Sequence, residues 1–451
     1  MQDTSSPSNT GPSRALAKLL RPFGRVEPSE AVSTLLLTLN VFALLTAYYL
    51  LKTAREPLIL LHGGAEVKSY AAAGQAALLL LVVKLYAGLA RRVGRLKLLA
   101  TVYLFSAVNL LVFAALVRAG AVIGVPFYLW VGVFNATAIA QFWAFSADIF
   151  SPEQGRRLFA VLGIGSSTGA VAGARMARSL AALGPAFMML GAALILVGCV
   201  ALFAVVDRLN PTRAARSNDA PEQPLSSEGP FQLFLHDRYL QLIAALTLVL
   251  NCCNSNGEYI LDRALLTTVA DSKTHGAPAE AFVASFKADY FAWVNAAGVC
   301  LQLFAVSRVL TRFGVRRALT VLPIVALIGY GTVAAAPVLG LIRMAKVAEN
   351  SLDYSLQNTA GQALYLVATR TEKYVGKTLI DGFIVRMGDV MSALVVLLGA
   401  AVGMQIRGFA WINLGLVCVW VALVIAVGAE HARRSRHVTA PGGELGAVPA
   451  S

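Results

Sequence analysis

Charged residues are scarce in this chain of 451 residues. Asp, Glu, Lys and Arg make up 14% of it, 57% is hydrophobic, and the mean hydropathy is +0.67. Soluble domains carry about 25% charged residues, so this composition excludes an ordinary soluble domain and is typical of an integral membrane protein. A helix that spans a bilayer needs roughly 20 mostly apolar residues. Twelve such segments are predicted, centred near residues 41, 79, 107, 133, 169, 195, 249, 297, 325, 354, 392 and 418.

Cysteine and histidine are also scarce, with five residues of each. All five cysteines fall in predicted spans and show no metal-ligand spacing, so we expect small buried side chains there and no metal site. The histidines are scattered near predicted loops and helix ends. The Gly-Lys-Thr triplet at 376–378 lacks the upstream glycine of a phosphate-binding loop, because that position is Thr371. The sequence therefore predicts neither an enzyme nor a bound cofactor.

Acidic residues are fewer than basic ones, which leaves a formal net charge of +14. Of the 38 Lys and Arg residues, 24 fall in tails and loops on the side of the N-terminus, ten on the opposite side and four within spans. This bias predicts cytoplasmic termini in a multi-pass protein of the cell membrane, here the bacterial inner membrane, and implies no nucleic-acid partner. Residues 1–30 lack the apolar core of a cleavable signal peptide. The basic stretch 13–25 is either amphipathic on the inner membrane surface or a disordered tail.

The chain divides into two halves with six predicted spans each. Three pairs of residues share an offset of 219 or 220 between the halves: Gly94 with Gly314, Glu153 with Glu372, and Gly169 with Gly388. Two six-helix repeats are one architecture of secondary transporters, with the substrate site between them. The predicted regions are a cytoplasmic tail (1–30), the N-terminal half (31–206), a cytoplasmic linker (207–236), the C-terminal half (237–429) and a second cytoplasmic tail (430–451).

A basic loop and a glycine stripe refine this architecture. The loop at 88–99 resembles the cytoplasmic loop between helices 2 and 3 of the major facilitator superfamily, although the acidic residue usual there is Arg91. Together with the repeat, it predicts an all-α integral membrane fold of twelve transmembrane helices in two six-helix repeats, major-facilitator-like. Gly165, Gly169 and Gly173 recur every four residues, which predicts a close-packing face between membrane helices.

Ionisable residues occur in the predicted span near residue 354, where charge is costly and usually faces the interior or a water-filled cavity. The matching region of the first half carries a single charge, at its end. This asymmetry favours a functional cavity. The alternative is an interhelical ion-pair network that holds the halves together, with Lys84, Arg386 or Asp389 as partners. The polar residues form one stripe at helical spacing: Arg343, Lys346, Asn350, Asp353 and Gln357.

The first helix of each half also carries charge beside a predicted interruption. Pro57 disfavours the helical region at Glu56, which follows Arg55. In the second half, Glu258 follows a polar stretch that ends in Gly257. Interrupted polar segments in corresponding places of two halves indicate a transport site. The alternative is that Arg55 and Glu258 are interfacial charges that extend to water.

Stretches of both halves resemble, in order, the non-mitochondrial ATP/ADP translocase family. They lie at residues 50–67, 142–165, 254–266 and 354–383. That family depends on a Lys in helix 1, a Glu near helices 4–5, a Glu in helix 7 and a Lys at the start of helix 11. The resemblance implies these roles for Arg55, Glu153, Glu258 and Lys377, and Asp381 matches as well.

Helix 10 departs from the pattern of that family. Asp353 and Gly361 stand where nucleotide exchangers have Lys, Asn358 where they have Asp, and Gln362 where they have Glu. The loss of two cations argues against a bound triphosphate, so the resemblance supports a transporter more firmly than a nucleotide substrate. The residues expected to bind substrate are Arg55, Glu153, Glu258, Arg343, Lys346, Asp353, Lys377 and Asp381.

The predicted function is secondary transport by alternating access, exchanging nucleotides such as ATP and ADP or related anions. One alternative is an ion-coupled major-facilitator-type carrier of another polar metabolite. A second is a non-transporting membrane protein built on the same fold. The expected partners are a small polar or anionic solute, a nucleotide in the leading case, and the lipid bilayer, with the chain acting as a monomer.

Overall fold

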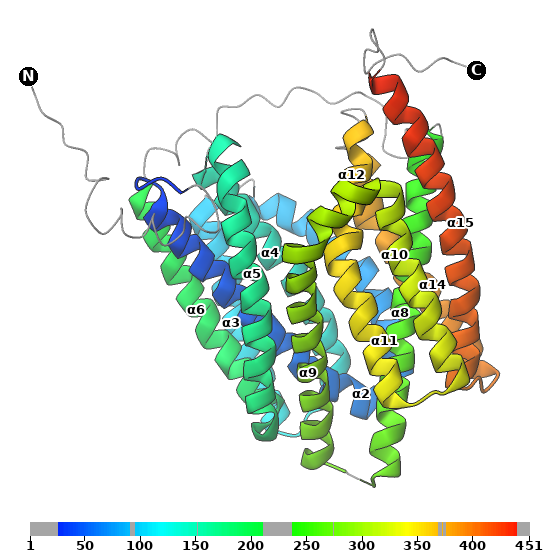
Figure 1. The fold of residues 1–451 in the computed structure, drawn as a ribbon. Coiled ribbons are helices and arrows are strands. Elements are labelled where there is room, and N and C mark those ends of the chain that lie inside the picture. Colours follow the sequence, from blue (N-terminus) through cyan, green and yellow to red (C-terminus); the bar gives the residue numbers. More distant parts are fainter. Residues whose placement is uncertain are drawn as a thin grey trace, which may run out of the picture. The chain divides into compact units, whose positions relative to one another are not determined.

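The computed structural model describes residues 26–90, 95–150, 152–210, 237–273, 275–368, 372 and 376–439. Nearly all of these residues are helical, and no β-strand occurs among them (Figure 1). The all-α prediction is therefore confirmed. The basic stretch 13–25, most of the linker and the end of the C-terminal tail lie outside the described residues.

The helices follow the hydrophobic segments of the sequence. Eight helical stretches within the described ranges are long and apolar enough to cross a membrane. Each of the twelve predicted centres falls on helical residues, but the count of twelve spans stays a prediction. The first half contains α2 (Ala31–Ala90), α3 (Arg95–Arg118), α4 (Gly124–Ile149), α5 (Pro152–Leu180) and α6 (Pro185–Leu209). The second contains α8 (Arg238–Asp271), α9 (Ala277–Leu301), α10 (Ser307–Ala335), α11 (Leu339–Leu352), α12 (Asn358–Leu364), α14 (Val385–Ala401) and α15 (Ile406–Thr439).

Helix α2 contains the first two predicted spans and departs from helical geometry at Gly64, where φ is 79°. Glycine adopts this conformation without the steric penalty of other residues. Glu56 and Pro57 lie within continuous helix, so the predicted break at Glu56 is wrong. A membrane helix tolerates proline when neighbouring groups satisfy the freed carbonyl. Helix α8 runs unbroken past Glu258, so the interruption predicted there is wrong too.

The chain forms two compact units. Unit 1 comprises Met1–His62, Leu78–Glu222 and His275–Ala292, and unit 2 comprises Gly63–Ala77, Gln223–Thr274 and Trp293–Ser451. Each unit therefore consists of most of one half and a short segment of the other. We call residues 63–77 and 275–292 the exchanged segments. Each contains the start of the second predicted span of its half.

Glycines let α5 approach the backbone of α2 in unit 1. A Cβ at Gly165 would lie 2.7 Å from the carbonyl oxygen of Thr38, and one at Gly169 would lie even closer to that of Phe42. Gly173 faces the next turn of α2 in the same way. The close-packing face predicted from the four-residue spacing is therefore confirmed.

The same contact recurs in unit 2 between α14 and α8. A Cβ at Gly388, the predicted counterpart of Gly169, would lie 2.6 Å from Asn251 Cβ and 3.0 Å from the carbonyl oxygen of Leu248. The first helix of each half thus meets a later helix of the same half across a glycine. This correspondence agrees with the predicted repeat.

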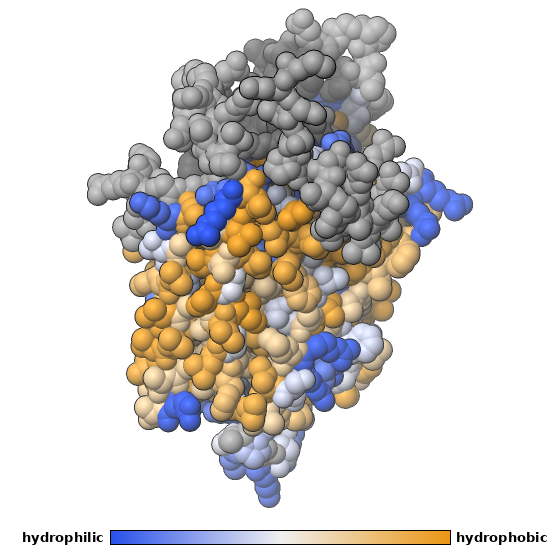
Figure 2. All heavy atoms as spheres, turned by 90° about the vertical axis from the view of Figure 1, so that its left-hand side faces the viewer, coloured by the Kyte–Doolittle hydropathy of each residue, from blue (hydrophilic) through white to orange (hydrophobic). Residues whose placement is uncertain are grey.

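Apolar side chains cover the outward faces of α3 and α6. Phe105 and Leu194 are 65% and 75% exposed, and Val108 and Leu111 are exposed beside Phe105. Figure 2 shows apolar residues over most of the face it presents, with hydrophilic residues gathered near its upper and lower edges. Such a surface suits lipid and would be a large apolar patch in water, as expected of a multi-pass membrane protein.

The cysteines only partly meet the prediction that all are buried. Cys199, Cys252 and Cys253 are buried, whereas Cys300 and Cys418 are exposed. The prediction is wrong for these two because hydropathy places a residue within a span without distinguishing a lipid-facing surface from the protein core. A thiol behaves as a small hydrophobic group and is tolerated in either place.

Candidate functional site

The predicted polar stripe lies in unit 2 on α11 and the following π-helical turn, η5 (Asp353–Gln357). It divides into two environments. Lys346 and Asn350 are buried, whereas Asp353 and Gln357 line a cavity. Arg343, at the start of the stripe, is half-buried. The stripe therefore contains both an ion-pair network and a cavity wall, the two alternatives that the sequence left open.

Lys346 is the centre of the buried network. Its Nζ lies 3.1 Å from Glu349 Oε2 and donates a hydrogen bond to Asn254 Oδ1 at 2.7 Å. Tyr330 of α10 donates to Glu349 Oε2 at 2.8 Å. The side chains of Lys346 and Glu349 are only 1% and 5% exposed. A buried charge pair of this kind depends on hydrogen bonds that satisfy its partners. Lys346 Nζ and Glu349 Oε2 have such bonds, whereas Glu349 Oε1 makes none with the described residues.

Glu258 of α8 faces this network. Its Oε1 lies 4.0 Å from Lys346 Nζ and accepts a hydrogen bond from Asn350 at 2.8 Å. The predicted partners Arg386 and Asp389 pair with each other instead, at 3.1 Å. The side chain of the third predicted partner, Lys84, lies outside the described residues. Lys346 thus belongs to an ion-pair network, but this network lies within unit 2 and joins residues of the second half only. The partners predicted at Arg386 and Asp389 are wrong.

A cavity of about 240 Å³ lies in unit 2 among α8, η5, α12 and a second π-helical turn, η8 (Ile380–Ile384). Helix α8 supplies most of its apolar wall, through residues such as Ile243 and Leu250. None of its described lining residues is basic. The polar lining comes from Asp353, Tyr354, Gln357, Asn358, Gln362, Tyr365 and Asp381, together with Thr247.

Two π-helical turns present the carboxylates of this cavity. Asp353 is the first residue of η5, and Asp381 is the second residue of η8. Such turns are rare, appear mostly as single bulges inside α-helices, and are frequent at functional sites. The regular 3.6-residue period predicted a continuous helix here, and nothing in the local pattern indicated the extra residue. The bulges are therefore a feature that the sequence did not predict.

Two buried polar atoms of the cavity lining make no hydrogen bond with the described residues. They are Gln357 Oε1 and the Tyr365 hydroxyl, on side chains of residues that are 6% and 8% exposed. An unsatisfied buried donor or acceptor is unfavourable by about 1–3 kcal/mol. Both side chains line the cavity, so each atom can bond with a solute or water once a rotation of its side chain exposes it.

Arg55 lies in unit 1 on α2. Its Nε donates to Glu56 Oε1 at 3.2 Å, and its guanidinium lies over the ring of Tyr128, 4.4 Å from the centroid. One turn earlier, Lys52 Nζ lies 4.3 Å from the ring centroid of Phe291. Both cations are therefore held against aromatic faces, an arrangement that stabilises a partly desolvated charge.

The other predicted residues are distributed between the cavity and undescribed parts of the chain. Lys377 Nζ lies 3.6 Å from Asp381 Oδ2 and 5.9 Å from the ring centroid of Tyr365. The structure thus brings Lys377, Asp381 and Asp353 to the same region of unit 2. The side chain of Glu153 lies outside the described residues, so its predicted role has no structural test.

A charge cluster at the end of α15 was not predicted. Arg434 binds both carboxylate oxygens of Asp237 at 2.9 Å and reaches Glu372 Oε1 at 3.1 Å. Asp237 also caps α8 by accepting the Leu240 amide hydrogen bond at 3.0 Å. Burial raises the pKa of Asp237, but hydrogen bonding with Glu372, Leu240 and Arg434 outweighs burial and holds the pKa below its ordinary value. The cluster fixes the start of α8.

Buried charges in the exchanged segments were also missed. Lys68 and Lys287 count among the outer-side charges by sequence, yet both are buried in ion pairs, with Asp262 and Glu56 respectively. Their residue numbers differ by 219, the offset of two of the other repeat pairs, and that spacing could have identified them.

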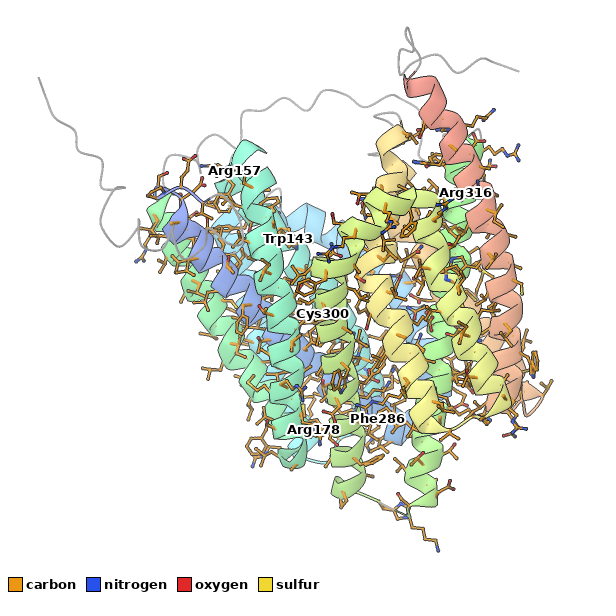
Figure 3. All side chains as sticks on the ribbon, viewed as in Figure 1. Trp143, Arg157, Arg178, Phe286, Cys300 and Arg316 are labelled. Atoms are coloured by element: carbon orange, nitrogen blue, oxygen red, sulfur yellow. The ribbon has the colours of Figure 1, made fainter. Side chains whose placement is uncertain are left out.

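The two ends of α5 carry arginines at opposite ends of the helix bundle. Figure 3 shows Arg178 at the same end as Phe286 of α9, and Arg157 at the other end.

Comparison with known proteins identifies the fold. No protein-family model matches the sequence, and no curated protein sequence is significantly similar to it. A mutant form of the nucleoside transporter NupG is similar in structure, with a TM-score of 0.65 and 13% identity over 88% of this chain and 99% of that chain. A mutant peptide transporter POT is also similar, with a TM-score of 0.65 and 11% identity over 89% of this chain and 95% of that chain. A POT family transporter in complex with 5-aminolevulinic acid has a TM-score of 0.61 and 11% identity over 89% of this chain and 96% of that chain.

These identities are low, so the similarity establishes the fold alone. The chain has the major-facilitator-type fold of these transporters, as the sequence predicted. The resemblance to ATP/ADP translocases has no counterpart among these matches and stays a prediction.

Proposed function

We propose that the protein is a secondary transporter that moves a small polar solute across the membrane by alternating access. The observation that carries this proposal is the polar cavity of unit 2. A π-helical turn holds Asp353 and Gln357 in its lining, and Gln357 and Tyr365 each carry a buried polar atom that bonds with none of the described residues. A non-transporting protein on this fold has no need for a carboxylate presented to a cavity. Intramembrane charges that line cavities mark substrate or ion pathways.

Transport by the full chain in proteoliposomes tests this proposal directly. Uptake of labelled nucleosides, nucleotides, amines and short peptides would be measured with and without internal counter-substrate and with and without a proton gradient. We expect saturable uptake of at least one solute above that of empty liposomes. Uptake driven by a proton gradient supports an ion-coupled carrier, and uptake that requires internal solute supports an exchanger. No uptake under any of these conditions would overturn the proposal.

A second candidate function is nucleotide exchange, and Arg55 is the observation that favours it. A guanidinium over an aromatic ring offers a fork of donors suited to phosphate. In addition, Arg55 occupies the position where the resembling translocases depend on Lys. Its existing pair with Glu56 leaves the cation only partly available to an anion.

Substitution of Arg55 tests this second candidate. We expect Arg55→Lys to retain measurable ATP and ADP exchange, because charge is kept. Arg55→Gln loses a charge-assisted hydrogen bond of roughly 1.5–3 kcal/mol, which corresponds to binding on the order of 10- to 100-fold weaker. Exchange assays on equally expressed variants make the comparison. Equal exchange by Arg55→Gln and the parent would place the nucleotide site elsewhere or exclude it.

We also propose that both termini face the cytoplasm of a bacterial cell, in its inner membrane. The excess of Lys and Arg on that side supports this orientation. Single-cysteine variants in a background without the native cysteines provide the test. We expect an impermeant maleimide to label Lys273→Cys in intact cells, and Ala220→Cys only after permeabilisation. The reverse pattern would invert the orientation.

A further inference from the structure

We propose that the unit 2 cavity recognises the N–H donors of an amine, amidine or amino-substituted ring on a solute without net negative charge. This inference rests on the proposed transport function and names its substrate class. It stands on the composition of the lining, on the two buried groups without partners, and on the charge balance of the cavity.

The hydrogen-bond inventory of the cavity favours acceptors. Ionised Asp353 and Asp381 accept hydrogen bonds and donate none. Gln357 carries a buried Oε1 that no described residue satisfies. The Tyr365 hydroxyl is the complementary group, since it can donate to one acceptor atom of the solute. A solute that carries an N–H group beside an acceptor matches this arrangement.

The charge balance excludes a strongly anionic solute. Lys377 neutralises Asp381 at 3.6 Å, whereas no ion pair involves Asp353 among the described residues. When Asp353 is ionised, the described lining presents one carboxylate in excess and repels a like charge on the solute. A triphosphate would add several negative charges next to Asp353.

The size of the cavity also favours a small solute. Pockets for drug-sized ligands measure about 300–1,000 Å³, and this cavity measures about 240 Å³. It accommodates a small metabolite or the terminal group of a larger one. The adjacent apolar wall from α8 would pack against the body of such a solute.

Direct binding to the purified full chain tests the solute class. The probes are agmatine, a cation with amine and guanidinium groups, adenosine, which is uncharged, and ATP, which adds a triphosphate to the same base. We expect agmatine or adenosine to bind at least tenfold more tightly than ATP. Tighter binding of ATP than of adenosine would overturn the inference, as would an absence of binding by both agmatine and adenosine at millimolar concentration.

Two cavity variants separate recognition from folding. Asp353→Asn should weaken agmatine binding about tenfold, and Glu280→Gln on α9 is the control with the same change of net charge. Gln357→Met removes an unsatisfied buried acceptor, so thermal stability should hold or rise, while binding of the preferred probe falls several-fold. Unchanged binding in both variants would overturn the inference. Binding that depends on Asp353 without any transport would overturn the proposed function instead and leave the cavity assignment in place.

A separate observation concerns the exchanged segments. We infer that the Glu56–Lys287 and Asp262–Lys68 ion pairs are matched latches, which hold the two halves together at one end of the membrane and break when that end opens. The Lys287 Nζ lies 3.6 Å from Glu56 Oε2 within unit 1, and Lys68 Nζ lies 2.7 Å from Asp262 Oδ2 within unit 2.

The two pairs are related by the repeat. Each joins the end region of the first predicted span of one half to a lysine of the second predicted span of the other half. The lysines are 219 residues apart, the offset of Gly169 and Gly388. By chain order, both pairs belong to the end of the membrane where the first spans finish, which is the outer end in the proposed orientation.

Burial makes these pairs suitable as latches. The side chains of Glu56 and Lys287 are 1% and 0% exposed, and those of Asp262 and Lys68 are 2% and 11% exposed. Separating such charges while they stay buried is strongly unfavourable, whereas separation with entry of water restores their hydration. The pairs therefore favour two arrangements, closed and fully opened, over intermediate ones. Alternating access requires that contacts between halves at each end be broken in turn.

Labelling of a buried reporter cysteine tests the latches. Ala288 and Ala65 lie in the exchanged segments and are 0% and 1% exposed, so Ala288→Cys and Ala65→Cys report opening of that end. In a background with Cys300 and Cys418 replaced by Ala, we expect Lys287→Met and Lys68→Met each to raise outside labelling by an impermeant maleimide several-fold. The variant with both substitutions should be labelled faster than either.

Charge reversal and an exposed pair provide the controls. The swap Asp262→Lys with Lys68→Asp should return labelling toward the parent rate, and it leaves Glu56, which also pairs with Arg55, unchanged. Arg178 also pairs with an exchanged segment, through Asp289, but its side chain is 49% exposed, so Arg178→Gln should change labelling less than twofold. Unchanged labelling in both Lys→Met variants, or an equal rise in Arg178→Gln, would overturn the latch assignment. If the swap fails to insert, the independent Lys287→Met result decides.

Discussion

Lys346→Met is expected to destabilise the protein by about 3–5 kcal/mol, because removal of one partner leaves a charge buried without compensation. Glu349 would lose its ion pair at 3.1 Å, and Asn254 would lose the donor to its side chain. The nearby Glu258 carboxylate would lose the same cation, which lies 4.0 Å from its Oε1. The measurement is thermal unfolding of the purified protein in detergent, with the yield from membranes as a second readout.

A double variant distinguishes electrostatics from loss of packing. In Lys346→Met with Glu349→Gln, the neutral amide still accepts the hydrogen bond from Tyr330, so we expect the double variant to be more stable than Lys346→Met alone. If Lys346→Met unfolds at the parent temperature, the network does not stabilise the fold. Lys346 would then be free to act chiefly in solute binding, as the sequence predicted.

Gly169→Ala is expected to destabilise the packing of α5 on α2 by about 1–3 kcal/mol or more, since overpacking forces a backbone shift. The new Cβ would overlap the carbonyl oxygen of Phe42, a backbone atom that no rotamer change can move. Thermal unfolding and membrane yield again measure the effect. We expect a comparable loss for Gly388→Ala in the other unit, where the new Cβ would lie 2.6 Å from Asn251 Cβ.

Gly163 supplies a control on the same helix. A Cβ at Gly163 would meet no atom within 4 Å, so Gly163→Ala should be neutral or stabilising, by up to about 1 kcal/mol of helix propensity. Equal losses for Gly163→Ala and Gly169→Ala would show that helix flexibility, and not close approach, explains these glycines.

Local sequence patterns correctly predicted the features that depend on a single helix. Hydropathy gave the helical segments, and the spacing of Gly165, Gly169 and Gly173 gave the packing face, because both depend on periodicity along one helix. Hydropathy failed for Cys300 and Cys418, since a span may face lipid or core. The break predicted at Pro57 was wrong because the effect of a proline on a membrane helix depends on neighbours that can satisfy the freed carbonyl. The departure from helical geometry occurs at Gly64 instead.

The candidate site depended more on contacts distant in sequence. The stripe with Lys346 and Asp353 was recognisable from helical spacing, but its division between a network and a cavity depends on α8, α10 and two π-helical turns. Those turns displace side chains by one residue, a change that the average helical period cannot predict. Pairing of Lys68 with Asp262 required knowledge of which segments exchange between the halves.

The exchanged segments also affect how the chain is made. Synthesis proceeds from the N-terminus at about 5–20 residues per second. Asp262 follows Lys68 by 194 residues, so the aspartate is synthesised roughly 10–40 s after the lysine. A lysine at the centre of a membrane helix is unfavourable by about 2.5–3.5 kcal/mol, and one nearer the helix end is less unfavourable because it extends to water. The newly inserted first half therefore carries Lys68 without its ion pair to Asp262 until the ribosome has produced α8. Completion of the first half as a folded body thus depends on translation of the second.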